Sequence, residues 1–393
     1  MSEYFKQGFG LKQEVAPLIA ERYKSTLIEK MRQNGFQLSV SPFAFYLAQE
    51  FGFCYGVDKA IDFAFETRCK FPDRRIFITN EIIHNPRVNN QLREMGIEFL
   101  ESSEMYRDLK REDVVLLPAF GAEVSQLEDL KKIGCVLVDT TCGSVVAVWK
   151  RVEKYAKSGF TSLVHGKYDH EETKATTSQV LPYGGHYLVV KDLKEVEEIA
   201  KLIENKEGGA KIRDKYCKAS SPGFDPEKHL EKIGCANQTT MLSSESLQVA
   251  ERIKQALTIR YGDANVRDHF MHFDTICSAT QERQDAVTKL LAERQLDLLL
   301  VIGGFNSSNT SHLLEISEKT VPAYHISEAE DLVSLSQIRC KAVTEKTAQL
   351  ISNWLPQNAK NIGVTAGAST PNRVIEDVIR RFVELNGKSL SML

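Results

Sequence analysis

Short apolar runs alternate with segments of helical periodicity from about residue 48 to the end of the chain. Runs of four or five apolar residues, such as 114–117 and 298–302, predict buried strands. Apolar residues three or four positions apart, as in 58–66 and 145–158, predict helices. Strands separated by a helix within about thirty residues are typical of right-handed parallel crossovers. The pattern predicts an α/β chain with parallel-type sheets.

The first 47 residues have a different pattern. They look helical, with an amphipathic run over 15–33 that Gly35 ends. No residue there suggests chemistry, so we interpret 1–47 as an N-terminal helical extension that packs on the remaining chain or contacts another copy.

Three cysteines recur where a predicted strand meets a predicted helix. Asp-Thr-x-Cys occurs at 139–142 and again at 274–277, and a looser copy lies at 50–57. The three cysteines are Cys54, Cys142 and Cys277. A polar turn follows each at a nearly constant interval: His84 lies 30 positions after the first, His170 28 after the second and Ser307 30 after the third.

These intervals indicate a true internal repeat. Each unit closes with a strand that enters a small-residue turn, at 120–122, 238–240 and 367–369. We predict a trefoil of three small α/β domains around a pseudo-threefold axis. Their predicted bounds are 48–141, 142–276 and 277–393. Ligands bind outside the carboxyl ends of parallel strands, so all six turns are expected to face one central cleft.

Composition and charge narrow the class of function. The 393 residues are 42% hydrophobic and 26% charged, with a net charge of −3 and no block of like charges. Neither a nucleic-acid partner nor a membrane surface is therefore expected. The longest apolar run, 296–305, is far shorter than the roughly 20 residues that span a bilayer. We see no secretory signal or transit peptide and expect a cytoplasmic protein.

The eight cysteines are too dilute for a disulfide scaffold, and no Cys-x-x-Cys pair occurs. A small buried hydrophobic residue in a reducing cytosol is the ordinary interpretation of each. We retain this interpretation for five of them: Cys69, Cys135, Cys217, Cys235 and Cys340.

The three repeat cysteines point to a metal centre. Each precedes a predicted helix, whose N-terminal dipole favours a thiolate. Structural zinc normally takes four ligands from closely paired positions, whereas these three come from separate units. A 4Fe–4S cluster with three protein thiolates leaves one iron open to a substrate oxygen. Zinc and plain buried thiols remain alternatives.

The polar turns suggest an anion site. Hydroxyls, amides and imidazoles at helix starts can hold a diphosphate with little formal positive charge. The candidates are His84, His170, Thr239, Ser307, Ser308, Asn309 and Ser369. Ordinary helix capping is the alternative for the 307–309 turn, and loop histidines are the alternative for His84 and His170.

Glu172 is the predicted proton donor, because a partly desolvated carboxyl in a turn that faces the cleft can hold a proton near neutral pH. Thr239 is predicted to orient or relay that proton. Glu171 is the alternative proton donor. Either carboxylate could instead only stabilise the helix, through a favourable interaction with the positive N-terminal end of its dipole.

Seven motifs, in order, resemble the hydroxymethylbutenyl diphosphate reductases (the IspH or LytB family). They are Gly-Phe-Cys-Tyr-Gly-Val at 52–57, Ile-His-Asn-Pro at 83–86, Asp-Thr-Thr-Cys at 139–142, Asn-Gln-Thr-Thr at 237–240, Asp-Thr-Ile-Cys-Ser-Ala-Thr at 274–280, Gly-Phe-Asn-Ser-Ser-Asn-Thr at 304–310 and Val-Thr-Ala-Gly-Ala-Ser-Thr-Pro at 364–371. The resemblance covers about residues 48 to 380.

The resemblance implies one 4Fe–4S cluster per chain at the centre of the trefoil, with one open iron. Its implied ligands are Cys54, Cys142 and Cys277, and its implied diphosphate-binding residues are His84, His170, Ser307, Ser308, Asn309 and Ser369. Glu172 would supply protons and Thr239 would contact the substrate. The implied reaction is a two-electron, two-proton reductive dehydroxylation of an allylic diphosphate to isopentenyl and dimethylallyl diphosphate, the last step of the methylerythritol phosphate route. Ferredoxin or flavodoxin would supply the electrons.

Two positions depart from the commoner bacterial pattern. Phe120 stands where many relatives carry a histidine, and the turn at 165–173 differs, so His165 competes with His170 as the diphosphate ligand. Both features resemble the longer plant and cyanobacterial branch. A bacterial cytosol is the expected location.

Overall fold

The computed structural model describes residues 3–390. They divide into two compact units that are not contiguous in sequence. Unit 1 comprises 3–4 and Leu100–Cys277, and unit 2 comprises Phe5–Phe99 and 278–390.

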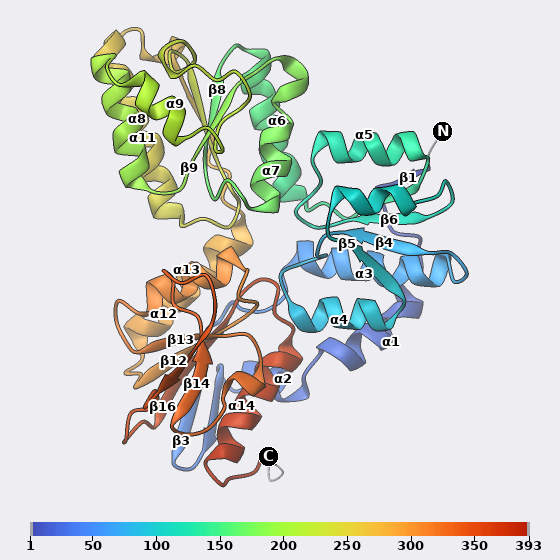
Figure 1. The fold of residues 1–393 in the computed structure, drawn as a ribbon. Helices are drawn as coiled ribbons and strands as arrows, with labels where there is room; N and C mark the ends of the chain where they lie inside the picture. Colours follow the sequence, from blue (N-terminus) through green and yellow to red (C-terminus); the bar gives the residue numbers. More distant parts are fainter. Residues whose placement is uncertain (1–2, 391–393) are drawn as a thin grey trace. The chain divides into compact units, whose positions relative to one another are not determined.

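Unit 1 contains a four-stranded sheet in the order β11-β10-β8-β9, with every neighbouring pair parallel. Its strands are β8 (Thr161–His165), β9 (Tyr187–Val190), β10 (Ile233–Asn237) and β11 (Phe270–His272). Helices cover both faces (Figure 1): α8 (Leu193–Asn205) and α11 (Ser243–Tyr261) on one, and α6 (Gly143–Lys157) and α7 (Glu171–Ser178) on the other. The carboxyl ends of β8 and β10 lead into the predicted polar turns.

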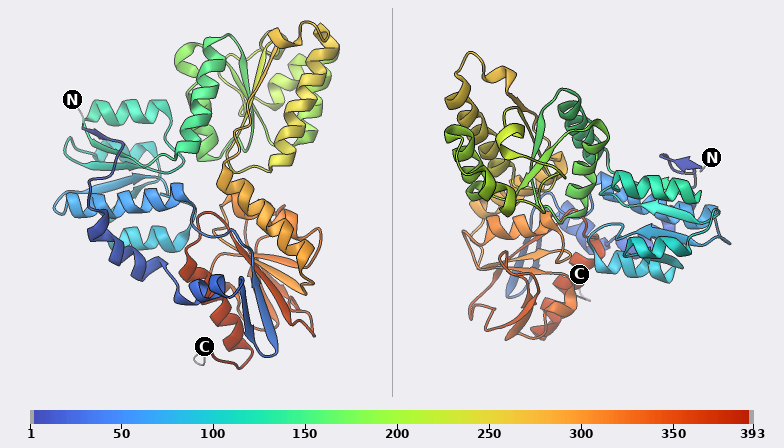
Figure 2. Two further views of the ribbon diagram at one scale, coloured as in Figure 1. Left: turned by 180° about the vertical axis from the view of Figure 1, so that it is seen from behind. Right: turned by 45° about the horizontal axis from the view of Figure 1, so that its top comes forward.

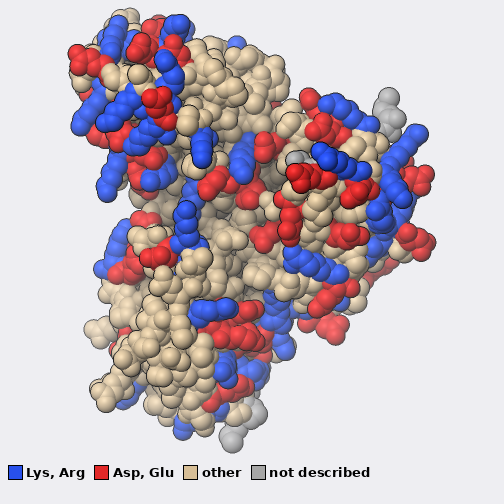
Figure 3. All heavy atoms as spheres, viewed as in Figure 1, with Lys and Arg blue, Asp and Glu red and all other residues tan. Residues whose placement is uncertain are grey.

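The parallel pair β6 (Val114–Leu117) and β7 (Val136–Asp139) also belongs to unit 1. Between them lies α5 (Val124–Ile133), which ends at Gly134 in the left-handed conformation that glycine adopts without steric cost. Over α8 and α9 (Gly209–Lys215), at upper left in Figure 3, basic and acidic side chains intermix, as in the Lys215–Glu198 ion pair.

Unit 2 contains a five-stranded sheet in the order β13-β12-β16-β3-β2. The strands are β2 (Gln37–Val40), β3 (Phe43–Leu47), β12 (Leu298–Ile302), β13 (Ala323–Ile326) and β16 (Asn361–Ala366). All pairs are parallel except β2–β3. Figure 2 shows the blue N-terminal strands beside the red C-terminal strands of this sheet.

The helical prediction for the N-terminal extension is partly wrong. Two helices form, α1 (Lys12–Tyr23) and α2 (Thr26–Gln33), separated where the Ser25 side chain caps α2. Residues 37–47 instead form β2 and β3, because the alternating apolar side chains of β3 are buried when that strand pairs with β16.

Two layers of helices bury the unit 2 sheet. α2 and α14 (Asn372–Leu385) pack into the larger apolar cluster, and α12 (Ser278–Glu293) and α13 (Ser308–Ser317) pack into the second (Figure 1).

The elements of the two units not yet given are α3 (Tyr55–Lys70), β4 (Ile76–Thr79), α4 (Pro86–Glu94), β5 (Ile97–Leu100), α10 (Pro226–His229) and the antiparallel hairpin β14 (Gln337–Cys340)–β15 (Gln349–Ser352), with short 3-10 turns and β1 (Tyr4–Phe5).

The predicted α/β class with mostly parallel sheets is confirmed. Within residues 3–390, no helix combines the length and apolar character that crossing a membrane requires. The pseudo-threefold arrangement and the bounds of the three domains stay predictions.

Candidate functional site

Each repeat cysteine directly precedes a helix, as predicted. Cys54 and Cys142 are the N-cap residues of α3 and α6, with extended backbone, and Cys277 comes immediately before α12. All three side chains are half-buried. Half-burial just before a helix leaves a thiol accessible to a ligand and places it near the positive end of the helix dipole.

The main chain holds the three cysteines in the same way. The Cys54 N–H donates to the Ala368 carbonyl at 3.2 Å, the Cys142 N–H to that of Ala119 at 3.0 Å and the Cys277 N–H to that of Thr239 at 3.3 Å. Each acceptor lies in or beside one of the predicted closing turns, at 120–122, 238–240 or 367–369. The repeat inferred from sequence therefore corresponds to one hydrogen-bonding pattern used three times.

The aspartates of the two Asp-Thr-x-Cys motifs shape their turns. Asp139 Oδ1 accepts the Thr141 N–H at 2.9 Å, and Asp274 Oδ1 accepts the Ile276 N–H at 3.0 Å. Such Asx turns redirect the chain from the strand to the helix. At the first motif, the Tyr4 hydroxyl donates to Asp139 Oδ2 at 2.7 Å. Burial is the main cause that raises the pKa of Tyr4, and the negative charge of Asp139 adds to it. The N-terminal segment thus supports the Cys142 turn, a role that its sequence did not reveal.

Unit 1 brings two of the cysteine turns together. The Ser144 hydroxyl, in the first turn of α6, donates to Cys277 Sγ at 3.4 Å. Ser144 lies two residues after Cys142, so the Cys142 turn and the Cys277 turn are adjacent. Cys54 belongs to unit 2.

The other cysteines divide into two groups. Cys135, Cys235 and Cys340 are buried as predicted, and burial raises the pKa of Cys340 to about 11. The prediction is wrong for Cys69 and Cys217, which are exposed, because each lies at or beyond the end of a helix that faces solvent there.

Glu172 and Thr239 form a direct pair in unit 1. Glu172 Oε1 accepts the Thr239 N–H at 2.6 Å, and Oε2 accepts the Thr239 hydroxyl at 2.9 Å. Both side chains are buried. His170 caps the same helix, α7: its Nδ1 accepts the Glu172 N–H at 3.2 Å, and the Phe120 ring meets its imidazole edge-on with centroids 5.8 Å apart. The chain thus joins the predicted acid to its predicted relay.

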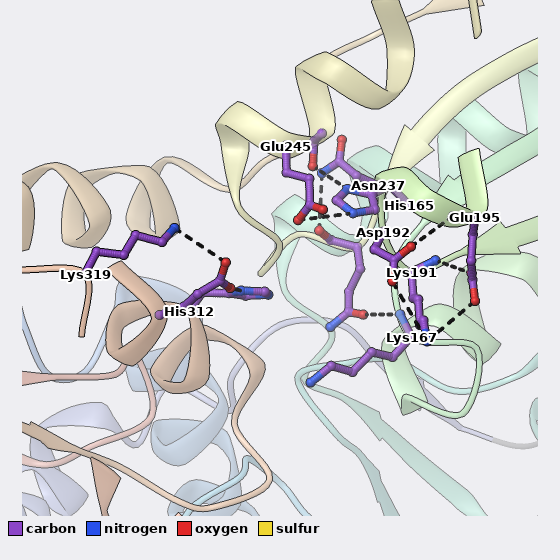
Figure 4. Close-up of polar contacts among 12 residues, drawn as sticks. His165, Lys167, Lys191, Asp192, Glu195, Asn237, Glu245, His312 and Lys319 are labelled. Atoms are coloured by element: carbon purple, nitrogen blue, oxygen red, sulfur yellow. Dashed lines mark hydrogen bonds and ion pairs between the residues drawn. The ribbon is translucent and has the colours of Figure 1, made fainter. Parts of the chain in front are cut away.

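His165, the alternative to His170, is buried at the end of β8. Its Nδ1 lies 2.8 Å from the Ser246 hydroxyl, and its Nε2 lies 3.9 Å from a Glu245 oxygen (Figure 4). Both ring nitrogens therefore face residues of α11, whereas His170 lies at a helix N-terminus.

Unit 2 contains the other predicted anion-binding turn. Ser307 caps α13 by accepting the Thr310 N–H at 3.3 Å, which matches the capping alternative. The next two residues differ: Ser308 Oγ and Asn309 Nδ2 are buried and have no hydrogen-bond partner within residues 3–390. Asn309 Oδ1 accepts the Ala368 N–H at 3.0 Å, so this turn also contacts the Ala368 turn. Buried unpaired donors are costly, and an anion would satisfy them.

Glycines allow the turns of unit 2 to approach closely. A Cβ on Gly304 would overlap the His84 carbonyl oxygen, and one on Gly367 would overlap the Thr310 hydroxyl. The His84 turn therefore lies against the loop that carries Ser308 and Asn309. His84 is itself buried, with Nδ1 2.9 Å from Glu81 Oε2. Ser369, in the neighbouring turn, is half-buried.

Comparison with known proteins decides the family. The family described as LytB protein matches residues 45–383. The chain belongs to the LytB family. Among its relatives, the 4-hydroxy-3-methylbut-2-enyl diphosphate reductase of a Picosynechococcus species is 48% identical over 383 residues, covering 96% of this chain and 93% of the relative. That of Gloeobacter violaceus is 47% identical, covering 98% and 93%.

Solved structures agree with this membership. A structure described as (E)-4-hydroxy-3-methyl-but-2-enyl diphosphate reductase, the terminal enzyme of the non-mevalonate pathway, is 28% identical, with TM-score 0.53; it covers 86% of this chain and 99% of its own. A reductase from Plasmodium falciparum shares the fold at TM-score 0.63 and 22% identity, covering 88% and 90%. The predicted family and fold class are confirmed.

Sequence reasoning missed two residues of this LytB-family chain that hold the cysteine turns. Arg283, buried on α12, donates to the Gly52 carbonyl at 2.6 Å and the Ala279 carbonyl at 2.7 Å, and so fixes the backbone two residues before Cys54. Trp149 on α6 packs so closely on Gly121 that no Cβ would fit there. An arginine within an otherwise helical pattern gives no sign of such a long-range partner.

Replacing Gly304 is expected to impair substrate binding. Gly304→Ala pushes the His84 carbonyl away from the Ser308 turn, which is the predicted diphosphate site, so we expect KM for the diphosphate to rise about tenfold, with a stability loss of about 1–3 kcal/mol from overpacking. Steady-state kinetics and thermal unfolding measure the two effects. Gly159→Ala is the control: its positive φ of 73° costs about 1 kcal/mol but nothing lies nearby, so KM should not change. An unchanged KM in Gly304→Ala contradicts this account of the turn.

Proposed function

We propose that this chain reduces 4-hydroxy-3-methylbut-2-enyl diphosphate to isopentenyl and dimethylallyl diphosphate, the last step of the methylerythritol phosphate pathway. The observation that carries the proposal is the threefold pattern in which Cys54, Cys142 and Cys277 each precede a helix and donate their N–H to a closing turn. Family membership supports the same activity.

These three cysteines are the proposed ligands of one 4Fe–4S cluster with an open iron. The donor set fits: three half-buried thiols in equivalent turns with no disulfide among the described cysteines. The Ser144 hydroxyl that faces Cys277 Sγ suits a thiolate, because hydrogen bonds to sulfur stabilise its negative charge. When bound, the cluster supplies the electrons and a Lewis-acidic site for the leaving hydroxyl.

The diphosphate is proposed to bind through His84, His170, Ser307, Ser308, Asn309 and Ser369. Ser308 Oγ and Asn309 Nδ2 support this assignment most directly, since both are buried donors without a partner within residues 3–390. The N-termini of α4, α7 and α13 add backbone N–H groups and favourable dipoles. An anion can thus be held without a lysine or arginine among its proposed ligands.

Glu172 is the proposed proton donor and Thr239 its relay to the substrate. In the reaction the allylic C–O bond breaks, two electrons and two protons are taken up, and the hydroxyl leaves as water. The Thr239 hydroxyl donates to the ionised Glu172 at Oε2. When the carboxyl is protonated the bond reverses, so that Glu172 donates to the Thr239 oxygen and the hydroxyl can give its own proton to a bound substrate. Burial of both groups keeps bulk water from competing.

The electrons are proposed to come from ferredoxin or flavodoxin, and the cytoplasm, where free cysteines persist, is the proposed location.

Turnover of the diphosphate by the anaerobically purified chain tests this function. With reduced ferredoxin or flavodoxin, both isopentenyl and dimethylallyl diphosphate should form, and without a reductant neither should. Conversion without any reductant would indicate a hydro-lyase instead. A colourless, zinc-containing protein without turnover would contradict the proposal.

A further inference from the structure

We propose that Asn237 and Thr275 are positioning residues that set the position of the Cys277 thiolate. Neither residue is among the proposed ligands of the cluster or the substrate. The inference deepens the proposed function, because it rests on Cys277 being a cluster ligand. It is argued from contacts within unit 1 alone.

The two side chains form a reciprocal clamp. The Thr275 hydroxyl donates to Asn237 Oδ1 at 2.7 Å and lies 3.2 Å from the Asn237 carbonyl, and it accepts the Asn237 N–H at 3.0 Å. The Thr275 N–H donates to Asn237 Oδ1 at 3.3 Å. Both residues are buried, so the clamp is shielded from water.

The clamp replaces main-chain pairing that has stopped. β10 and β11 pair only as far as Cys235 and His272. Beyond that point the two segments that follow β10 and β11 are joined by the Asn237–Thr275 contacts and then by the hydrogen bond from the Cys277 N–H to the Thr239 carbonyl. Asn237 ends β10 beside His165, the end of β8 (Figure 4), so its main chain is held by the sheet.

The other two cysteine turns have a main-chain hydrogen bond at the position of the clamp. Before Cys142, the Thr140 N–H donates directly to the Leu117 carbonyl at 3.1 Å, at the end of the paired strand. Before Cys54, the Gly52 N–H donates to the Ala366 carbonyl at 3.4 Å. In the Cys277 turn, the equivalent N–H of Thr275 instead reaches a side-chain amide oxygen.

The Cys277 turn therefore has a side-chain pair at the position where each of the other two turns has a direct main-chain hydrogen bond. The carbonyl of Thr239 that holds the Cys277 N–H belongs to the residue whose N–H and hydroxyl hold Glu172. A shift of the clamp would move the Cys277 ligand and the proton donor relative to each other. The clamp couples these two functional groups.

The test compares Thr275→Val, which removes the hydroxyl at nearly constant volume, with Thr275→Ser, which retains it. Thr140→Val is the matched control: it removes the hydroxyl bonded to the Leu117 carbonyl at 2.6 Å but leaves the main-chain bond. Hydrogen–deuterium exchange is measured in the full-length chain without iron for the 273–279 peptide, for the corresponding 138–144 peptide around Thr140 and for α8. The reduced-cluster electron paramagnetic resonance spectrum and kcat are measured after anaerobic reconstitution.

We expect Thr275→Val to raise exchange in 273–279 about tenfold, with Thr275→Ser and Thr140→Val raising it in their own turns by less than about threefold. With iron bound, Thr275→Val should alter the cluster spectrum and lower kcat more than it changes KM, and Thr275→Ser should restore both.

Equal exchange in Thr275→Val and wild type would overturn the proposal. So would a rise in α8 as large as that in 273–279, because the clamp would then be a general stability element. A wild-type chain that binds no iron would contradict the proposed function, while the exchange comparison would still decide whether the clamp holds the Cys277 turn.

Discussion

Glu172→Gln should lower turnover by at least about a hundredfold while leaving iron content and the cluster spectrum unchanged. The amide has nearly the shape of the carboxyl and can still accept the Thr239 N–H through its oxygen, so the local structure should persist. What it loses is a proton that it can donate and regain in each cycle. Activity assays together with absorption spectra of the anaerobic protein separate these two effects.

Glu171→Gln is the control, because Glu171 is the adjacent residue in the first turn of α7 and the sequence left both carboxyls as candidates. Glu171 is half-buried, whereas Glu172 is buried against Thr239. Turnover in Glu171→Gln should stay within about threefold of wild type. Full activity in Glu172→Gln, or a larger loss in Glu171→Gln, would assign the proton transfer elsewhere.

Cys277→Ser should yield a folded chain that retains little or no intact cluster and has lost more than about a hundredfold in activity. A serine can keep the N–H bond to the Thr239 carbonyl, so the turn should survive without its thiolate. Iron analysis, circular dichroism and turnover report on ligand, fold and function.

Cys217→Ser provides the comparison, since Cys217 is exposed and lies outside the cysteine repeat. It should keep full iron content and turnover. If Cys277→Ser unfolds the chain while binding as much metal as wild type in its folded fraction, Cys277 is a structural residue and the proposed ligand set is wrong.

Much of the secondary structure was predictable where local signals were strong. The predicted strand over 298–302 is the observed β12, and the predicted helix over 145–158 is the observed α6 (Gly143–Lys157). A glycine marks the end of α5. These elements have apolar periodicity and capping residues within their own segments, so no distant partner was needed to recognise them.

β2 and β3 were missed because their stability comes from a distant partner. β3 pairs with β16, more than 300 residues further along the chain, and this pairing turns a segment beside two helices into sheet. The hairpin β14–β15 was missed for a different reason: β15 is exposed along its whole length and so lacks the apolar pattern of a buried strand.

In the candidate site, too, features with a local sequence signal were predictable and contacts between distant segments were not. The cysteines were recognisable because Asp-Thr-x-Cys is repeated, and the repeat reflects a local Asx turn at Asp139 and Asp274. The Glu172–Thr239 pair was predicted as two roles but not as one contact. The Asn237–Thr275 clamp and the Arg283 bond to Gly52 join residues far apart in sequence, and no local pattern encodes such a contact.

The most direct test of the account is the electron paramagnetic resonance spectrum of the anaerobically purified, reduced protein with and without the allylic diphosphate substrate, alongside an iron determination. We predict about four iron atoms per chain and a cluster signal that shifts when substrate is added, because the proposed three-cysteine ligation would leave one iron open to the substrate hydroxyl. A cluster signal that substrate leaves unchanged, or a protein that contains zinc and no iron, would contradict it.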